Sequence, residues 1–211
     1  MAPSPVSAPD DTSALWLATL QRAMSRASHD VKDAINGVSV NLEVVRSRTA
    51  RADMPASSVA GFAEAAAQQL ERLTTLIEAV LSLGRSAREP ADVAITLRRV
   101  VAICAASSSA ADAGVELAEE QNDASTVTRV RGELLRLALA GPLLDAVEAS
   151  GQARASMVRC TVATSADAVL VTMRANGRRV TVPDPLQDAM RGAGIRWNDA
   201  GPDLSLAFPR P

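Results

Sequence analysis

Two stretches in the first part of the chain carry hydrophobic residues at spacings of three and four. Such spacing places apolar side chains on one face of a helix with 3.6 residues per turn. The first stretch predicts a helix from Ser13 to about Ala50, with an apolar seam at Leu20, Met24, Ala27, Val31, Ala34, Val38, Leu42 and Val45. After a break at Asp53-Met54-Pro55, the second predicts a helix with a seam at Val59, Phe62, Ala66, Leu70, Leu73, Ile77, Val80 and Gly84.

A helical hairpin with one apolar seam on each helix cannot bury both seams by itself. Two hairpins paired about a two-fold axis form a four-helix bundle that covers all the seams. We therefore expect a homodimer held together by residues 13–88. An unrelated antiparallel coiled coil is the alternative interpretation of the same pattern.

After Glu89-Pro90 the hydrophobic pattern changes to short strands that alternate with helices. The expected strands are 93–97, 114–117, 127–130, 155–164, 168–174 and 204–208, and the expected helices are 98–113, 133–149 and 185–191. Helices interleaved with antiparallel-type strands indicate an α/β sandwich. The predicted organisation is a flexible arm at 1–12, a helical hairpin at 13–88 and an α/β domain at 89–211.

Composition and charge narrow the classes of function. The net charge of −2 argues against non-specific binding to nucleic acid. No apolar run approaches the ~18 residues of a membrane span, and the first residues do not resemble a signal peptide, so we expect a cytoplasmic protein that does not bind membranes. Cys104 and Cys160 are too few and too far apart for a metal motif, and we expect them reduced and no metal centre.

His29 is the only histidine of the 211 residues. It lies two positions after Ala27 of the seam, which is about 200° around the helix, so it is expected to face solvent. A lone histidine on a solvated helix face is in general a side chain without a function. The residues around this one favour a functional role instead.

The string Ser28-His29-Asp30-Val31-Lys32, followed by Ile35-Asn36 and Val40-Asn41-Leu42-Glu43, resembles the phosphoacceptor helix of bacterial sensor histidine kinases. In that family a histidine, followed by an acid and then by a base three residues on, accepts the phosphoryl group. Two positions differ from the family. Asp33 replaces the usual Thr, Asn or Gln that orients water for phosphatase activity, and Ala34 replaces a frequent proline.

The order of elements after residue 89 resembles the ATP-binding domain of the same family, and the closing Leu-Ser-Leu-Ala-Phe-Pro is also similar. The family's first ATP motif uses two asparagines on a helix to hold magnesium and phosphates. Gly141 and Asp145 stand at those positions here. Pro142 beside them removes a backbone donor from the helix and is expected to kink it.

The family's second ATP motif is Asp-x-Gly-x-Gly, in which the acid binds adenine. The equivalent segment has Ala175 at the acid, Gly177 at the first glycine and Arg179 at the second. About twenty residues then remain before the last strand, too few for a lid that cradles phosphates at a helix N-terminus. We expect no ATP binding, no autophosphorylation and no cofactor.

A phosphoacceptor-like helix followed by a degenerate ATP domain resembles the dimeric histidine phosphotransferases of two-component phosphorelays. The resemblance implies that His29 takes a phosphoryl group from the aspartate of one receiver domain and passes it to another, with magnesium supplied by the receiver. Asp30 would orient the imidazole and Lys32 would pair with phosphoryl oxygens. The charge of Asp33, one turn further on, would repel the incoming group.

A second hypothesis uses the same residues without chemistry. The chain would be a pseudokinase-like scaffold or modulator whose dimer binds a response-regulator receiver domain or a partner histidine kinase. The retained His29, Asp30 and Lys32 favour phosphotransfer over this scaffold. A working ATP-dependent kinase with an unusual pocket is the third and weakest hypothesis.

Overall fold

The computed structural model describes residues 11–51, 54–84, 91–106, 113–119, 125–150, 156–176 and 179–211. Most of the predicted arm at 1–12 therefore lies outside the described residues, and helix α1 begins at Asp11. The change of pattern at Glu89-Pro90 also lies outside them. No helix of the described ranges is long and apolar enough to cross a membrane.

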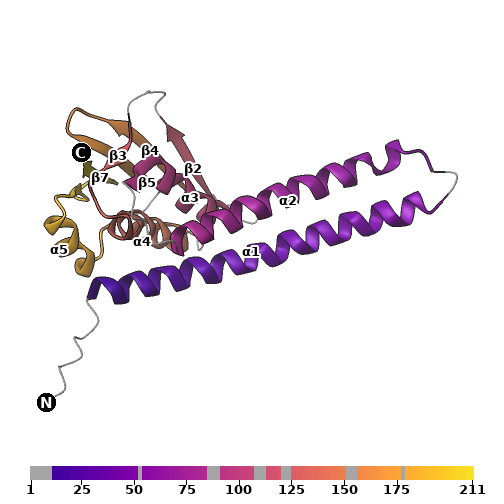
Figure 1. Cartoon of the computed structure of the whole chain (residues 1–211), viewed down its shortest axis with the longest axis horizontal. Helices are drawn as coiled ribbons and strands as arrows, with labels where there is room; N and C mark the ends of the chain where they lie inside the picture. Colours follow the sequence, from indigo (N-terminus) through magenta and orange to yellow (C-terminus); the bar gives the residue numbers. More distant parts are fainter. Residues whose placement is uncertain are drawn as a thin grey trace, which may run out of the picture.

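Two long helices form the N-terminal hairpin. Helix α1 spans Asp11–Thr49 and helix α2 spans Ser57–Gly84, which confirms both predicted helices. The hairpin extends from the α/β part of the molecule as an antiparallel pair (Figure 1). Gly37 lies where the helices approach closely, because a Cβ atom added there would be 3.5 Å from Cγ of Gln69 on α2.

The two helices pack along a strip of mostly small side chains. The buried residues of this strip are Thr19, Ala23, Ala27, Asp30 and Ala34 on α1, and Ala66, Leu76 and Ala79 on α2. Four members of the predicted seams, Met24, Leu42, Leu70 and Ile77, are instead exposed in the single chain. The single hairpin therefore leaves part of each predicted seam uncovered.

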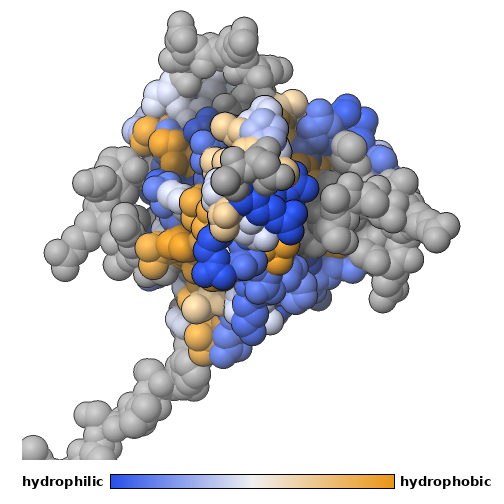
Figure 2. All heavy atoms as spheres, turned by 90° about the vertical axis from the view of Figure 1, so that its right-hand side faces the viewer, coloured by the Kyte–Doolittle hydropathy of each residue, from blue (hydrophilic) through white to orange (hydrophobic). Residues whose placement is uncertain are grey.

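Most of the exposed large hydrophobic residues of the hairpin follow one line on each helix. Those on the line are Leu17, Met24, Ile35 and Leu42 on α1, and Leu70, Ile77 and Leu81 on α2, and we call them the exposed apolar stripe. Val40 on α1 is also exposed but lies about 200° around the helix from Leu42. Spacings of seven, eleven and four residues keep each set on one helix face. Figure 2, which looks at the hairpin from its tip, shows orange hydrophobic side chains among blue hydrophilic ones.

The remaining elements form an α/β sandwich, so the predicted fold class is confirmed. They are β1 Ala91–Asp92, α3 Val93–Ala106, β2 Ala113–Glu119, β3 Val127–Thr128, α4 Gly132–Ser150, β4 Ser156–Thr164, β5 Ala168–Ala175, α5 Asp184–Gly192, β6 Arg196–Asn198 and β7 Asp203–Pro209. The main sheet has the strand order β2-β4-β5-β7-β6, and β1 pairs with β3 separately.

Three expectations for this part of the chain were wrong. Residues 93–97 begin α3 rather than a strand, because the carboxylate of Asp92 accepts a hydrogen bond from the backbone N–H of Ile95 and caps the helix. Strands β2 and β4 are parallel, whereas we expected antiparallel-type strands throughout. Strand β6 was not predicted, and it is only three residues long.

One face of the sheet packs against the helices. On β4 and β5 the buried side chains alternate with more exposed ones, as expected when one face of a sheet is covered. Helix α4 runs unbroken through Pro142, with Leu135, Leu139 and Leu143 fully buried. This hydrophobic core also includes Ala23 and Ala79 from the base of the hairpin.

Cys104 and Cys160 are both free and buried in this core. Burial raises the pKa of each thiol to about 12. The reactive thiolate is therefore suppressed at neutral pH. Both residues act as small hydrophobic side chains, as predicted.

The glycine in the middle of α1 offers a test of the packing between the two helices. We expect Gly37→Ala to raise the free energy of unfolding by about 1 kcal/mol, because alanine has the higher helix propensity. The added methyl group would make only ordinary van der Waals contact with Gln69, at 3.5 Å. Chemical denaturation of both proteins measures the difference, and a destabilised variant would mean that the helices approach more closely than this.

Candidate functional site

His29 lies on an exposed face of α1, as predicted. Its side chain is 77% exposed, and Lys32 and Asp33 are also exposed one turn further along the helix. The i, i+3 and i, i+4 spacings bring these three residues onto one face. An imidazole in this position is open to approach by another protein.

The two acids near His29 differ in distance and burial. Oδ2 of Asp33 is 3.1 Å from Nδ1 of His29, within hydrogen-bond distance, and this carboxylate is 64% exposed. Oδ1 of Asp30 is 4.0 Å from the same nitrogen, and its side chain is only 6% exposed. The role of orienting the imidazole, which we expected of Asp30, is therefore better met by Asp33.

The contact with Asp33 determines which nitrogen of the imidazole is available. A neutral imidazole that donates its N–H to a carboxylate from Nδ1 carries its lone pair on Nε2. That lone pair is not used by Asp33. The arrangement thus leaves a nucleophilic nitrogen on the exposed side chain.

The same three residues also offer ligand atoms for a cation. One ligand atom each from His29, Asp30 and Asp33 lie within 4.8 Å of one another. Sequence reasoning expected no metal centre because the chain lacks a cluster of histidines or cysteines. The helical spacing of one histidine and two acids brings together a small donor set that this criterion missed.

Asp33 can be tested by two substitutions with opposite consequences. Asp33→Asn retains an oxygen acceptor for Nδ1 and removes the negative charge, so any phosphoryl acceptance by His29 should be unchanged or faster. Asp33→Ala removes the acceptor, and the same rate should fall by up to about tenfold, the upper value of one net hydrogen bond. Initial rates of phosphoryl transfer measure both variants. Equal rates in Asn and Ala variants would contradict an orienting role.

Asp145, which we expected at the position of the second family asparagine, takes part in an ion pair. Nη2 of Arg22 on α1 lies 2.7 Å from Asp145 and 2.7 Å from Glu148, both on α4. Hydrogen bonds to Glu148 and then to Asp145, which outweigh burial, raise the pKa of Arg22 above its ordinary value. The carboxylate of Asp145 is therefore already paired within the chain.

The other positions that we compared with the family's nucleotide motifs differ in burial and contacts. Gly141 is buried inside α4, and Ala175 is buried at the end of β5, with no polar side chain to contact a base. The guanidinium of Arg179 donates to the backbone oxygen of Asp199 in the loop before β7. Gly177 lies outside the described residues.

The base of the hairpin contacts α4 through residues that sequence reasoning did not select. The guanidinium of Arg136 lies 5.7 Å from the ring centre of Trp16. Arg136 is nearly buried, and burial lowers its pKa. Together with Arg22, this contact joins α1 to α4. No periodicity or motif signals such a contact, because its partners are about 120 residues apart.

Comparison with known proteins was made at three levels. No family model matches the sequence, and no curated protein matches it. Among solved structures, a bacterial phosphotransferase is 14% identical, with 98% of each chain covered and a TM-score of 0.44. Acinetobacter baumannii histidine kinase AdeS is 13% identical, with 86% of this chain and 97% of that chain covered and a TM-score of 0.38.

A third solved structure is that of histidine kinase ThkA in complex with response regulator protein TrrA. It is 13% identical, covers 92% of this chain and 63% of that chain, and has a TM-score of 0.43. The similar structures are thus histidine kinases and a phosphotransferase. Because these TM-scores lie below 0.5, the chemistry of this chain has to be argued from its own residues.

Proposed function

We propose that this chain is a histidine phosphotransferase of a two-component phosphorelay. It accepts a phosphoryl group on His29 from the aspartate of one receiver domain and passes it to the aspartate of another, without ATP. The observation that carries this proposal is the exposed His29, whose Nδ1 lies 3.1 Å from Asp33 while Nε2 remains available. The resemblance of the Ser28–Lys32 string to a phosphoacceptor helix supports the same function.

The transfer step follows from this geometry. The lone pair on Nε2 attacks the phosphorus of an aspartyl phosphate, so a P–N bond forms as the P–O bond to the receiver aspartate breaks. The receiver carboxylate leaves with the electron pair, and its magnesium ion neutralises the phosphoryl oxygens. The phosphorylated ring carries a positive charge with hydrogen on Nδ1, and an oxygen of Asp33 accepts the hydrogen bond from this N–H. Attack by the second receiver's aspartate reverses these changes.

The α/β domain supports a relay rather than an ATP-dependent kinase. A nucleotide in the family's position would need the carboxylate of Asp145, which is paired with Arg22. It would also need an acid at position 175, which is a buried alanine. The domain instead contributes packing against α1, and the hairpin and sandwich share one core.

A homodimer is part of the proposal. The exposed apolar stripe of α1 and α2 would be covered if two hairpins formed a four-helix bundle. Such a bundle would present two copies of His29 to receiver domains. Receivers are also the partners of the second candidate function, a scaffold without chemistry.

One observation favours that scaffold. The charged carboxylate of Asp33 lies 3.1 Å from Nδ1, on the same exposed ring as the Nε2 that would accept the phosphoryl group, and its negative charge would repel the incoming phosphoryl oxygens. Labelled phosphoryl transfer separates the two functions. Incubation with phosphorylated receiver domains from the same genome should label the protein, and the label should be acid-labile and base-stable, as a phosphoramidate is. Stable binding of receivers without label would support the scaffold.

The second test concerns ATP. Calorimetric titration of the full chain with Mg-ATP should show no saturable binding up to about 1 mM, a dissociation constant well above the range useful to a kinase. Incubation with γ-labelled ATP should leave the protein unlabelled. A micromolar dissociation constant for Mg-ATP would contradict the assignment of Asp145 and Ala175 to the degenerate motifs.

A further inference from the structure

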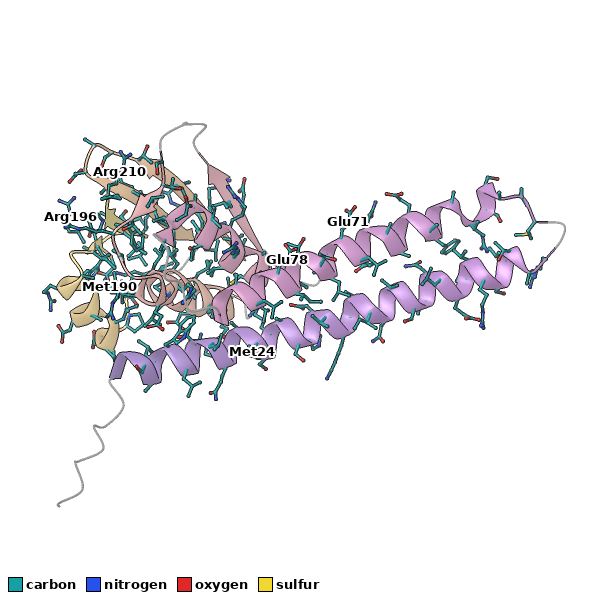
Figure 3. The ribbon with its side chains drawn as sticks, in the orientation of Figure 1. Met24, Glu71, Glu78, Met190, Arg196 and Arg210 are labelled. Atoms are coloured by element: carbon teal, nitrogen blue, oxygen red, sulfur yellow. The ribbon has the colours of Figure 1, made fainter. Side chains whose placement is uncertain are left out.

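A polar hollow lies at the end of the α/β domain that none of the proposed chemistry uses. Its volume is about 380 Å³, and its lining includes Arg129, Asp167, Gly194, Arg196 and Arg210. We call it the arginine hollow. Figure 3 shows Arg196 and Arg210 at the end of the domain remote from the hairpin tip.

The hollow is separate from the degenerate nucleotide motifs. It adjoins Asp167, just before β5 begins, whereas Ala175 is the last residue of that strand. At about 3.3 Å per residue, the strand places these two sites some 20 Å apart or more. His29 lies on helix α1 of the hairpin, which contributes no residue to the lining of the hollow.

The backbone around the hollow is held by hydrogen bonds between distant segments. The backbone N–H of Arg129 donates to the carbonyl of Pro209, 3.2 Å away, and the hydroxyl of Thr128 donates to the same oxygen at 2.7 Å. The backbone N–H of Arg210 donates to the carbonyl of Asp167 at 3.0 Å. The three arginines are thus carried by segments that are fixed relative to one another.

Positive charge exceeds negative charge among the side chains that line the hollow. Nη2 of Arg196 pairs with Asp167 at 3.0 Å, and Asp167 is the only acidic side chain among the nine lining residues, all of which the structure describes. The guanidinium of Arg210 donates to the neutral carbonyl of Ser165. Within the described part of the chain, Arg129 makes no ion pair. Two of the three guanidinium groups are therefore not paired with an acidic side chain.

Asp167 stays ionised at neutral pH, so it continues to pair with Arg196. The hydroxyl of Ser165, a backbone N–H and the guanidinium of Arg196 hold the pKa of Asp167 below its ordinary value. Its negative charge stays with Arg196. Arg129 and Arg210 are then the cations available to a ligand.

We propose that the arginine hollow binds a small ligand through a phosphate group. Guanidinium groups present paired N–H donors that match the oxygens of a phosphate, and a phosphate would pair with the two guanidinium groups that no acidic side chain pairs with. The volume suits a small molecule, and the lining contains no aromatic ring on which a nucleobase could stack. The phosphate itself is therefore the recognised group.

Gly194 keeps the hollow open beside Arg129. Its φ of +74° lies in the left-handed region, which favours glycine, and a Cβ atom added there would be 3.7 Å from Nη2 of Arg129. A larger side chain at this position would be strained and would extend beside the free guanidinium. Glycine satisfies the turn after α5 and leaves the guanidinium accessible.

Pyrophosphate is a suitable probe because it carries the proposed group and nothing else. Calorimetric titration of the full chain at low salt should give one site with a submillimolar dissociation constant, and Arg129→Gln and Arg210→Gln should each weaken it about tenfold or more. Arg99→Gln, an exposed arginine on α3, is the matched control and should bind like the wild type. Thermal unfolding of each variant establishes that it is folded.

Two results would overturn the proposal. The first is the absence of saturable binding by the wild type, or equal affinity in all four proteins, because the charge of Arg129 and Arg210 would then be irrelevant. The second is tighter binding of citrate than of pyrophosphate, because the hollow would then select carboxylates. Neither result bears on phosphoryl transfer through His29, which is measured separately.

Discussion

His29→Ala is expected to abolish acceptance of a phosphoryl group from receiver domains. The substitution removes the only imidazole of the chain, and no other residue in the described part offers an equivalent nitrogen. Because His29 is 77% exposed and the strip between α1 and α2 is formed by other residues, the fold and the oligomeric state should be unchanged. The measurement is the amount of labelled protein after incubation with a labelled receiver.

The control for this experiment is Asn36→Ala. Asn36 is exposed two turns along the same helix, and seven residues bring it to nearly the same face. It should accept label at the wild-type rate, because Asn36 is not expected to touch the phosphoryl group. Labelling of His29→Ala at an undiminished level would remove His29 from the mechanism. Binding of receivers by both variants without any label in the wild type would leave the scaffold as the function.

Substitution of the exposed apolar stripe is expected to produce the largest change in assembly. The wild type should have twice the chain mass of 22.0 kDa in light scattering at micromolar concentration. Ile77→Lys and Leu81→Lys, combined in one chain, should give the single-chain mass. Each side chain contributes about 1.5–3 kcal/mol when buried, and each substitution occurs twice in a dimer, so the dissociation constant should rise by several factors of ten.

A lysine on the opposite face of the same helix controls for the added charge. Thr75→Lys lies about 140° around α2 from the line of Leu70 and Ile77, and Thr75 is exposed. This variant should remain dimeric. A wild type that is monomeric at micromolar concentration would contradict the four-helix bundle. A dimer that persists in the double variant would show that another surface joins the chains.

The parts of the fold that were predicted correctly depend on neighbouring residues along the chain. Hydrophobic residues at spacings of three and four predicted the ends of α1 and α2 to within about two residues, because helical periodicity is a local property. The exposed position of His29 follows from the same periodicity. Residues 93–97 show the limit of this reasoning. Their β-branched residues alternate like those of a strand, but the cap from Asp92 and the packing of Leu97 favour a helix.

The residues of the candidate site, and their roles, could be predicted only in part from local spacing. The motif selected His29, Asp30, Lys32 and Asp33, and assigned the orienting role to the adjacent acid. In the helix, Asp30 is about 100° further around the axis and points toward the buried strip, while Asp33 lies one turn above His29. The distances therefore favour Asp33, which the sequence comparison had marked only as a departure.

By itself the sequence determined the two long helices and the exposure of His29, because each depends on local spacing. Tertiary structure decided which faces of α1 and α2 are buried, and that β2 and β4 pair in parallel. It also decided that Asp145 pairs with Arg22, and that Arg129, Arg196 and Arg210 meet in one hollow. These features join residues far apart in the chain, and their distances depend on packing of the whole core rather than on any local preference.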